Sequence, residues 1–273
     1  MLPLTFILLA CQPRDDSGGP ALDWSFAFEI ALTEYRAPGG GDALAWATVD
    51  NREGEAPPWE LEQAGGDCGF YGVREQVNCE PACEPGNTCT WDGECVEVST
   101  PIDAGVITVH GLDVGLTLAP SGEWVYYGYD FDPEPGDGEI FSEGDGITAQ
   151  AAGAALSPFE LETVGVAPLG SSLPCPLEPV PGDEVSVTWS PGQAGDRVRL
   201  SLASANHGSM FPAVICDTED DGELVVAASL VESWLDSRLP VWSWRLVRTH
   251  AGTAVVDGVE VRLSANATEG CSW

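Results

Sequence analysis

The sequence predicts an all-β protein of two antiparallel β-sandwich domains, immunoglobulin-like or jelly-roll-like in architecture, with a small disulfide-rich insert and one short helix. Two observations lead to this prediction. Apolar residues recur at every second position along many short runs, which is the period of a half-buried strand. The 32 Gly and 21 Pro residues separate these runs as turn formers. No period of 20–50 residues repeats, which excludes solenoids and propellers.

The alternating runs are the expected strands. The first begins at Trp24 and continues through Phe26, Phe28 and Ile30 to Leu32. Comparable runs lie at 185–189, 198–202, 242–246 and 259–263, and shorter ones near 44–49, 104–112, 123–129, 146–151 and 159–164.

One segment has the pattern of a helix. Ser229 and Glu232 match a capping box, in which each side chain bonds to the backbone N–H of the other residue. The apolar residues that follow Ser229 fall on one helical face. We expect a short helix over 229–237 that closes one end of a sandwich.

A Pro-rich stretch at 170–182 with little alternation marks the expected domain boundary. The first sandwich is then residues 24–170, with the cysteine-rich insert at 68–97, and the second is residues 171–273. The second has the size of an immunoglobulin-like domain but lacks the Cys-Trp-Cys spacing of that fold, so only its architecture is inferred.

The N-terminus has the features of an export signal. Residues 2–10 are apolar except for Thr5, and the run is shorter than the roughly 20 residues that span a bilayer. Leu8-Leu9-Ala10-Cys11 resembles the lipobox of bacterial lipoproteins, which implies that Cys11 takes a diacylglycerol and becomes the first residue after cleavage. We expect residues 1–11 to be the signal peptide with its lipidated cysteine and 12–23 to be a flexible tether.

No basic residue precedes Leu4, although signal peptides normally begin with a basic region. We therefore expect the start codon to lie upstream of Met1. The alternative interpretation of Cys11 is a buried cysteine on an apolar strand.

The chain is strongly acidic, with 44 Asp and Glu against 10 basic residues and a net charge of −34. Such a charge excludes nucleic acid as a partner and excludes adsorption to anionic membranes. We therefore expect the protein to contact the bilayer only through the lipid on Cys11. Its expected location is the cell envelope, anchored at the outer membrane or the cell surface. The acidity itself is explained by solubility through self-repulsion, with the binding of divalent cations as the alternative.

Eight cysteines remain without Cys11, and an even number in an exported chain indicates disulfides. Four of them lie in the insert and allow three pairings. We expect the interleaved one, Cys79–Cys89 with Cys83–Cys95, as in small growth-factor-like modules. The remaining pairs are expected to be Cys216–Cys271 and Cys68–Cys175. Zinc is the alternative for the insert, but its spacing offers only one ligand pair of the usual kind.

The segment from Cys68 to about Ala167, with CGFY, NCEPACEPGNTCTWDGECV and EIFSEGDGITAQAAGAALSPFEL, resembles a group of uncharacterised exported proteins and lipoproteins of myxobacteria and their relatives. The later VTWSPG and ICDTEDDGELVVAASLV fit the same group. The resemblance implies an exported β-rich protein and supplies no activity.

Two acidic clusters are candidates for calcium. Carboxylates at alternate positions followed by Gly resemble the start of a calcium loop, but neither cluster has the Glu that completes it. A solvated acidic turn is the alternative. The candidate ligands are Asp130, Asp132, Asp137 and Glu139 in the first cluster and Asp217, Glu219 and Asp221 in the second.

Most of the ten Trp residues lie on alternating positions and are expected in the core. Trp59 and Trp91 are less easily buried and are candidates for stacking on a sugar or anchoring a protein partner, with packing against the disulfides as the alternative. His110, His207 and His250 form no zinc-ligand pair, and we recognise no catalytic motif.

These features predict an exported, lipid-anchored protein with a non-catalytic binding or structural role toward an extracellular protein or glycan. The alternatives are a hydrolase that uses two carboxylates on a polysaccharide and a calcium-dependent adhesion module.

Overall fold

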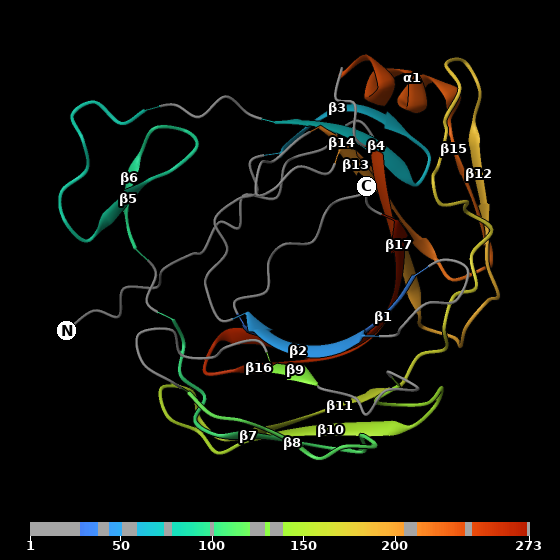
Figure 1. Ribbon diagram of the computed structural model, residues 1–273. Coiled ribbons are helices and arrows are strands. Elements are labelled where there is room, and N and C mark those ends of the chain that lie inside the picture. Colours follow the sequence, from blue (N-terminus) through green and yellow to red (C-terminus); the bar gives the residue numbers. More distant parts are fainter. Residues whose placement is uncertain are drawn as a thin grey trace.

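The computed structural model describes residues 28–37, 44–50, 59–73, 78–98, 101–120, 129–131, 139–204, 212–237 and 242–271. Within these ranges the chain is mostly β-strand with one short helix (Figure 1), which confirms the all-β prediction.

One large sheet of nine strands dominates the fold and curves through an arc in Figure 1. All neighbouring strands in it are antiparallel except β1 and β17, which run parallel. In spatial order the strands are β3 (Trp59–Gly65), β4 (Cys68–Val73), β14 (Ala213–Glu219), β13 (Arg197–Ser204), β16 (Trp242–Val256), β17 (Val259–Cys271), β1 (Phe28–Arg36), β2 (Leu44–Asp50) and β9 (Tyr129–Phe131).

Three smaller sheets accompany it. The four-stranded sheet has the order β11 (Phe159–Val164), β10 (Gly146–Ala151), β7 (Ile107–His110) and β8 (Leu116–Leu118). The two-stranded sheets pair β12 (Val185–Thr188) with β15 (Glu223–Val226), and β5 (Asn87–Cys89) with β6 (Cys95–Glu97).

The β16–β17 hairpin is the longest element of the fold. Its turn is Asp257-Gly258, and both residues have positive φ, 53° and 87°. This is the backbone of a two-residue turn whose twist matches that of the flanking strands, and Asp-Gly is a favoured sequence for it. The carboxylate of Asp257 also accepts from the backbone N–H and the hydroxyl of Ser157, which attaches the hairpin tip to the loop before β11.

The fold has two large cores. The first fills the space between the β1, β2 and β17 region of the large sheet and the four-stranded sheet. The rings of Phe28 and Phe159 meet there edge to face at 6.0 Å. The second core lies between β13, β14 and β16 on one side and β12, β15 and α1 (Ala228–Asp236) on the other. In Figure 1 these covering layers lie outside the arc of the large sheet.

Both cores use the same sheet, so the structure does not confirm two separate sandwiches. Chain segments divide between the cores near Val166 and Leu169, close to the expected boundary. However, β17 contributes to the first core and Cys271 at its end to the second, and β1 from the N-terminal half pairs with β17 from the C-terminal half.

Alternation predicted most strands correctly. Strands lie within or overlap the runs at 44–49, 104–112, 146–151, 159–164, 185–189, 198–202, 242–246 and 259–263. The first run is a strand from Phe28 onward, whereas Trp24 and Phe26 lie outside the described residues, as does most of 123–129.

The helix is present, but the predicted capping box is wrong. The helix begins one residue earlier than expected, and Ala227 is its N-cap without a side-chain hydrogen bond. The carbonyl of Ala227 accepts from the N–H groups of Leu230 and Val231, which places Ser229 inside the first turn. Leu230, Val231 and Trp234 are fully buried, so packing against the second core holds the helix.

Four disulfides join the eight cysteines of the described residues. The interleaved pairs Cys79–Cys89 and Cys83–Cys95 are confirmed. The predictions of Cys216–Cys271 and Cys68–Cys175 are wrong. Cys68 and Cys216 lie opposite each other on the paired strands β4 and β14 and are bonded, which leaves Cys175 to pair with Cys271.

The cysteine-rich insert has no core of its own. No residue of 78–98 is buried, and Figure 1 shows this hairpin standing apart from the large sheet. Its two disulfides therefore replace the apolar burial that folds the rest of the chain. None of the described helices is long and apolar enough to cross a membrane.

Mild reduction of the folded protein should open the two insert disulfides before Cys68–Cys216, because Cys68 and Cys216 are 0% exposed and a thiolate cannot reach them. Alkylation followed by peptide mass analysis should find label first on Cys79, Cys83, Cys89 and Cys95. Simultaneous labelling of Cys68 would contradict this order.

Candidate functional site

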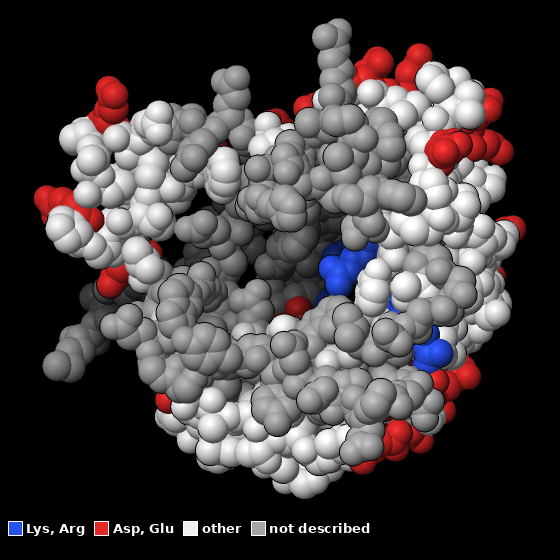
Figure 2. Space-filling view, in the orientation of Figure 1, with Lys and Arg blue, Asp and Glu red and all other residues white. Residues whose placement is uncertain are grey.

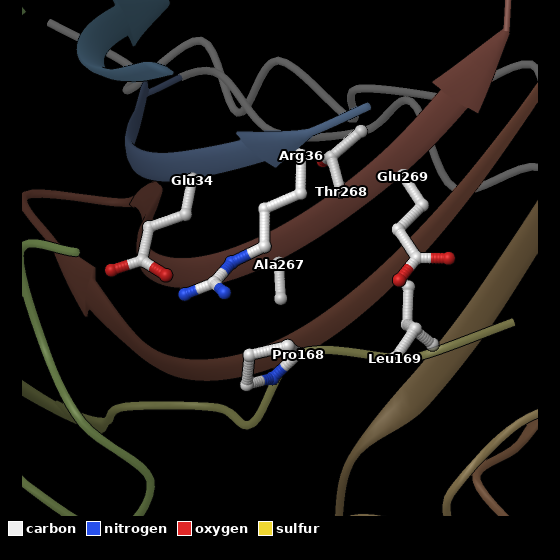
Figure 3. A pocket seen from close by; sticks show the side chains of 7 residues that line it. All are labelled: Glu34, Arg36, Pro168, Leu169, Ala267, Thr268 and Glu269. Atoms are coloured by element: carbon white, nitrogen blue, oxygen red, sulfur yellow. The ribbon is translucent and has the colours of Figure 1, made fainter. Parts of the chain in front are cut away.

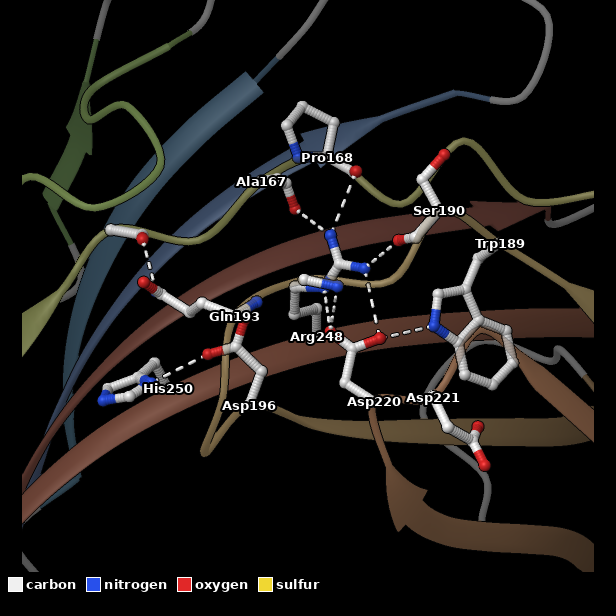
Figure 4. A network of polar contacts seen from close by, with 12 residues as sticks. Ala167, Pro168, Trp189, Ser190, Gln193, Asp196, Asp220, Asp221, Arg248 and His250 are labelled. Carbon is white, nitrogen blue, oxygen red and sulfur yellow. Dashed lines mark hydrogen bonds and ion pairs between the residues drawn. The ribbon is translucent and has the colours of Figure 1, made fainter.

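A buried arginine lies at the centre of the largest polar network among the described residues. Arg248 on β16 is 0% exposed, and Asp220, just after β14, has a side chain that is 2% exposed. The Arg248 guanidinium donates to both carboxylate oxygens of Asp220 (2.6 and 3.2 Å), to the carbonyls of Ala167 (2.8 Å) and Pro168 (3.1 Å), and to the carbonyl of Ser190 (Figure 4).

Asp220 is bound from two further directions. Its carboxylate accepts from the indole N–H of Trp189 at 2.5 Å and from the backbone N–H of Gly192 at 3.0 Å. A Cβ at Gly192 would lie 2.5 Å from oxygens of both Asp196 and Asp220 and 2.8 Å from Arg248 Nε, so this close approach requires glycine. Every strong donor and acceptor here is satisfied, and the site is closed to solvent. It therefore holds the fold together and does not bind a ligand.

Asp196 and His250 form a second pair at the edge of this network. Nδ1 of His250 lies 2.7 Å from Asp196 Oδ1, and the Asp196 side chain is 0% exposed while that of His250 is 24% exposed. The other Asp196 oxygen accepts from the backbone N–H of Gln193. Within the described ranges no hydroxyl or thiol bonds to the His250 ring, so the pair fastens the 193–196 turn to β16 without forming a nucleophile–base arrangement.

A shallow hollow of about 180 Å³ lies between β1, β17 and the segment at Pro168 and Leu169 (Figure 3). Glu34 on its edge is 3% exposed and accepts from the backbone N–H groups of Ile140 (2.6 Å) and Phe141 (3.2 Å). Burial raises the pKa of Glu34 above 4.5, although these hydrogen bonds and Arg36 act in the opposite direction. Part of this volume is open solvent, so the hollow encloses far less than the roughly 300 Å³ at which ligand pockets begin.

The inner, concave face of the large sheet gathers most of the described arginines. Val198, Leu200 and Leu202 of β13 face the second core, so the residues between them face the other way. The same alternation holds for β16, where Trp244 and Leu246 are buried. Arg197 and Arg199 of β13 and Arg245 of β16 thus share the inner face and form what we call the arginine cluster. Figure 2 shows arginine atoms and a carboxylate within the central hollow and further carboxylates around the outer surface.

Asp217 on β14 neutralises part of the arginine cluster. It bonds to Arg197 at 2.5 Å and to Arg199 at 2.7 Å. Arg245 has no carboxylate partner among the described residues, whereas the other five described arginines each contact one. Burial lowers the pKa of the Arg245 guanidinium, against a smaller opposite effect of Tyr35. The side chain of Arg245 is nevertheless exposed overall.

The two Trp candidates lie in different places. Trp59 on β3 is half-buried and packs against Tyr71, Ala213 and Ile215, on the inner face of the large sheet. Trp91 is half-buried in the turn between β5 and β6 of the insert. The structure does not bring them together.

Most of the calcium candidates either make other contacts or lie outside the described residues. Asp132 and Asp137 lie outside the described residues, Asp130 is described only as part of β9, and Glu139 pairs with Arg36. In the second cluster Asp217 is bound by two arginines, and Asp221 accepts from the backbone N–H of Glu223 as in a turn. These contacts disfavour a calcium loop, but only Asp221 lies in an acidic turn, because Asp217 and Glu219 belong to strand β14.

Among the described residues, the atoms grouped closely enough for a metal are the sulfurs of Cys79, Cys83 and Cys89. Since all three are in disulfides, they do not offer thiolates to zinc.

Sequence reasoning missed both Arg248 and the arginine cluster. Arg248 had a signal, because it continues the core-facing run of Trp242, Trp244 and Leu246. A charge at such a position indicates a buried ion pair. Arg199 and Arg245 gave no such signal, because they lie close together only through the pairing of β13 with β16.

Comparison of the chain with protein-family models, with curated proteins and with solved structures found no match.

Replacing Asp220 by Asn should destabilise the protein by about 3–5 kcal/mol, because the Arg248 charge would stay buried without its partner. Glu139→Gln, which breaks the exposed pair with Arg36, is the control and should cost about 0–1 kcal/mol. Denaturant unfolding of both variants measures these costs. Equal costs would contradict the role assigned to Arg248.

Glu34→Gln should gain stability relative to the parent as the pH rises. The folded protein holds the Glu34 proton more tightly than the unfolded chain, so ionisation above pH 4.5 costs folding free energy that the neutral amide does not incur. Unfolding free energies of both proteins at pH 4 and pH 7 test this. The expectation fails if the variant loses stability relative to the parent over this range.

Proposed function

We propose that the protein is an exported lipoprotein of the bacterial cell envelope, anchored through Cys11, with a non-catalytic binding role. The observation that carries the proposal is the disulfide pattern. All eight cysteines of the described residues pair with one another, so none of them is left for Cys11. Disulfides in such number are typical of oxidising compartments.

The lipobox resemblance gives the ninth cysteine a separate role. A cysteine outside the disulfide set, directly after an apolar run and before a polar tether, is where a lipid would be attached. The resemblance to exported proteins and lipoproteins of myxobacteria supports the same location.

A binding role is supported by the large sheet. Its inner face presents polar, cationic and aromatic side chains in a hollow, while its outer face is packed against the cores. We further propose that the chain forms two sandwich units that share this sheet, one built mainly from residues 24–170 and the other mainly from residues 171–273, with β17 and β4 each contributing to the core of the other unit.

A carboxylate-dependent hydrolase receives less support. The buried carboxylates of the described residues are held by arginines or backbone N–H groups: Asp220 by Arg248, Glu34 by Ile140 and Phe141, and Asp196 by Gln193. Carboxylates engaged in this way are poorly placed to protonate or attack a glycosidic bond.

Cys11→Ser should abolish membrane attachment. The gene, including the genomic sequence upstream of Met1, would be expressed in a bacterial host, and the detergent-extracted protein weighed intact. The parent should begin at Cys11, carry the lipid, and weigh two hydrogens less per disulfide for four disulfides. Ser17→Ala in the tether is the control and should behave as the parent. A parent that retains residues 1–10 and carries no lipid would refute the anchor.

A further inference from the structure

We propose that the inner face of the nine-stranded sheet binds a carboxylate-bearing glycan, with Arg245 and Arg199 holding the acidic group and the Tyr35 ring supporting the sugar. The inference rests on the proposed binding role and names its ligand class.

The first support is that Arg245 contacts no carboxylate of the described residues. The sequence holds 44 Asp and Glu, yet five of the six described arginines contact a carboxylate and Arg245 does not. A guanidinium offers a planar fork of donors that matches a carboxylate in two places at once.

Strand register places Arg199 beside Arg245. Ser201 lies opposite Arg245, and Val247 lies opposite Arg199, so the two arginines are diagonal neighbours on the inner face. Diagonal Cβ atoms on adjacent strands lie roughly 7–8 Å apart, within reach of two long side chains. Asp217 binds Arg197 and Arg199 together and so fixes the direction of the Arg199 side chain.

An aromatic ring borders the arginine cluster. Tyr35 on β1 lies opposite Thr268 of β17, in the same row across the sheet as Val247 and Arg199. Its hydroxyl donates to the carbonyl of Gly270 at 2.7 Å. A Cβ added at Gly270 would lie 3.5 Å from the Tyr35 ring, so the ring lies against the sheet where glycine leaves room. A ring held in this way can support a sugar face.

The position of the cluster within the sheet disfavours an extended acidic peptide. β13 and β16 each have neighbours on both sides, so their backbone groups are already paired. A peptide that binds by adding a strand needs a free sheet edge. Recognition here must use side chains, which suits a ligand of rings and carboxylates.

The net charge of −34 does not prevent binding. At physiological salt the Debye length is about 8 Å, so carboxylates on the outer surface are screened from a ligand in the hollow. Among the described residues, the acidic groups on the inner face near the cluster are Asp217, which is already paired, and Glu219 at the end of β14.

Calorimetric titration with tetragalacturonate tests the proposal. The parent and Cys11→Ser proteins should bind it equally, so failure of lipidation and failure of binding are separate results. The methyl-esterified tetramer, which has the same rings without charge, should not bind. Raising the salt concentration should weaken binding of the acid.

Arg245→Gln should lower the affinity about 10-fold or more, as expected for losing a hydrogen-bonded charge pair. The affinity of Arg245→Lys should lie between those of Arg245→Gln and the parent, since lysine keeps the charge but loses the planar fork of donors. Arg36→Gln, the same change away from the inner face, should alter affinity less than about 2-fold. Unchanged melting temperatures would show that each variant is folded.

Three results would overturn the proposal. They are the absence of binding, equal binding of the ester, and equal affinity of Arg245→Gln and the parent. Binding of poly-glutamate as tight as that of the glycan, with loss in Arg245→Gln, would reassign the face to acidic peptides.

Discussion

The ion pair between Arg248 and Asp220 is the contact on which the arrangement of the cores depends. It joins β16 to the end of β14 and, through backbone carbonyls, to the segments at 167–168 and 190. These segments lie where the chain passes from the first core to the second. Burying two charges is costly, and only the complete set of hydrogen bonds offsets that cost. The hydrogen bonds of this pair therefore hold the junction between the two cores in a single arrangement.

Two disulfides also hold the segments around this junction. Cys175–Cys271 attaches the Pro-rich boundary segment to the end of β17, and Cys68–Cys216 locks β4 to β14. Both link residues far apart in sequence, with separations of 96 and 148 residues. Closing such long loops removes much conformational entropy from the unfolded chain. These two disulfides therefore stabilise the two-core arrangement more than the two disulfides of the insert, which close short loops, stabilise the insert.

Alternation and turn residues predicted strands such as β13 and β17, because burial of one face imposes the period of two locally. They missed β4 and β14, which are buried on both faces and so do not alternate. The interleaved pairing in the insert was predicted from the resemblance to small growth-factor-like modules, because the spacing alone left three pairings open. The Cys68–Cys216 bond was not, because it depends on the pairing of β4 with β14 across 148 residues. The arginine cluster was hidden for the same reason. The helix start shifted because packing of Leu230 and Trp234 outweighed the capping signal at Ser229.

The parallel pairing of β1 with β17 has a consequence for how the protein is made. Phe28 lies opposite Val261, so the first described strand contacts nearly the last part of the chain. During synthesis β1 is made before β17. The apolar face of β1 therefore cannot be buried, and the large sheet cannot form, until β17 has been synthesised. Assembly of the first core is therefore a late event, and the exposed edge of β1 is the point at which an immature chain is most open to wrong partners.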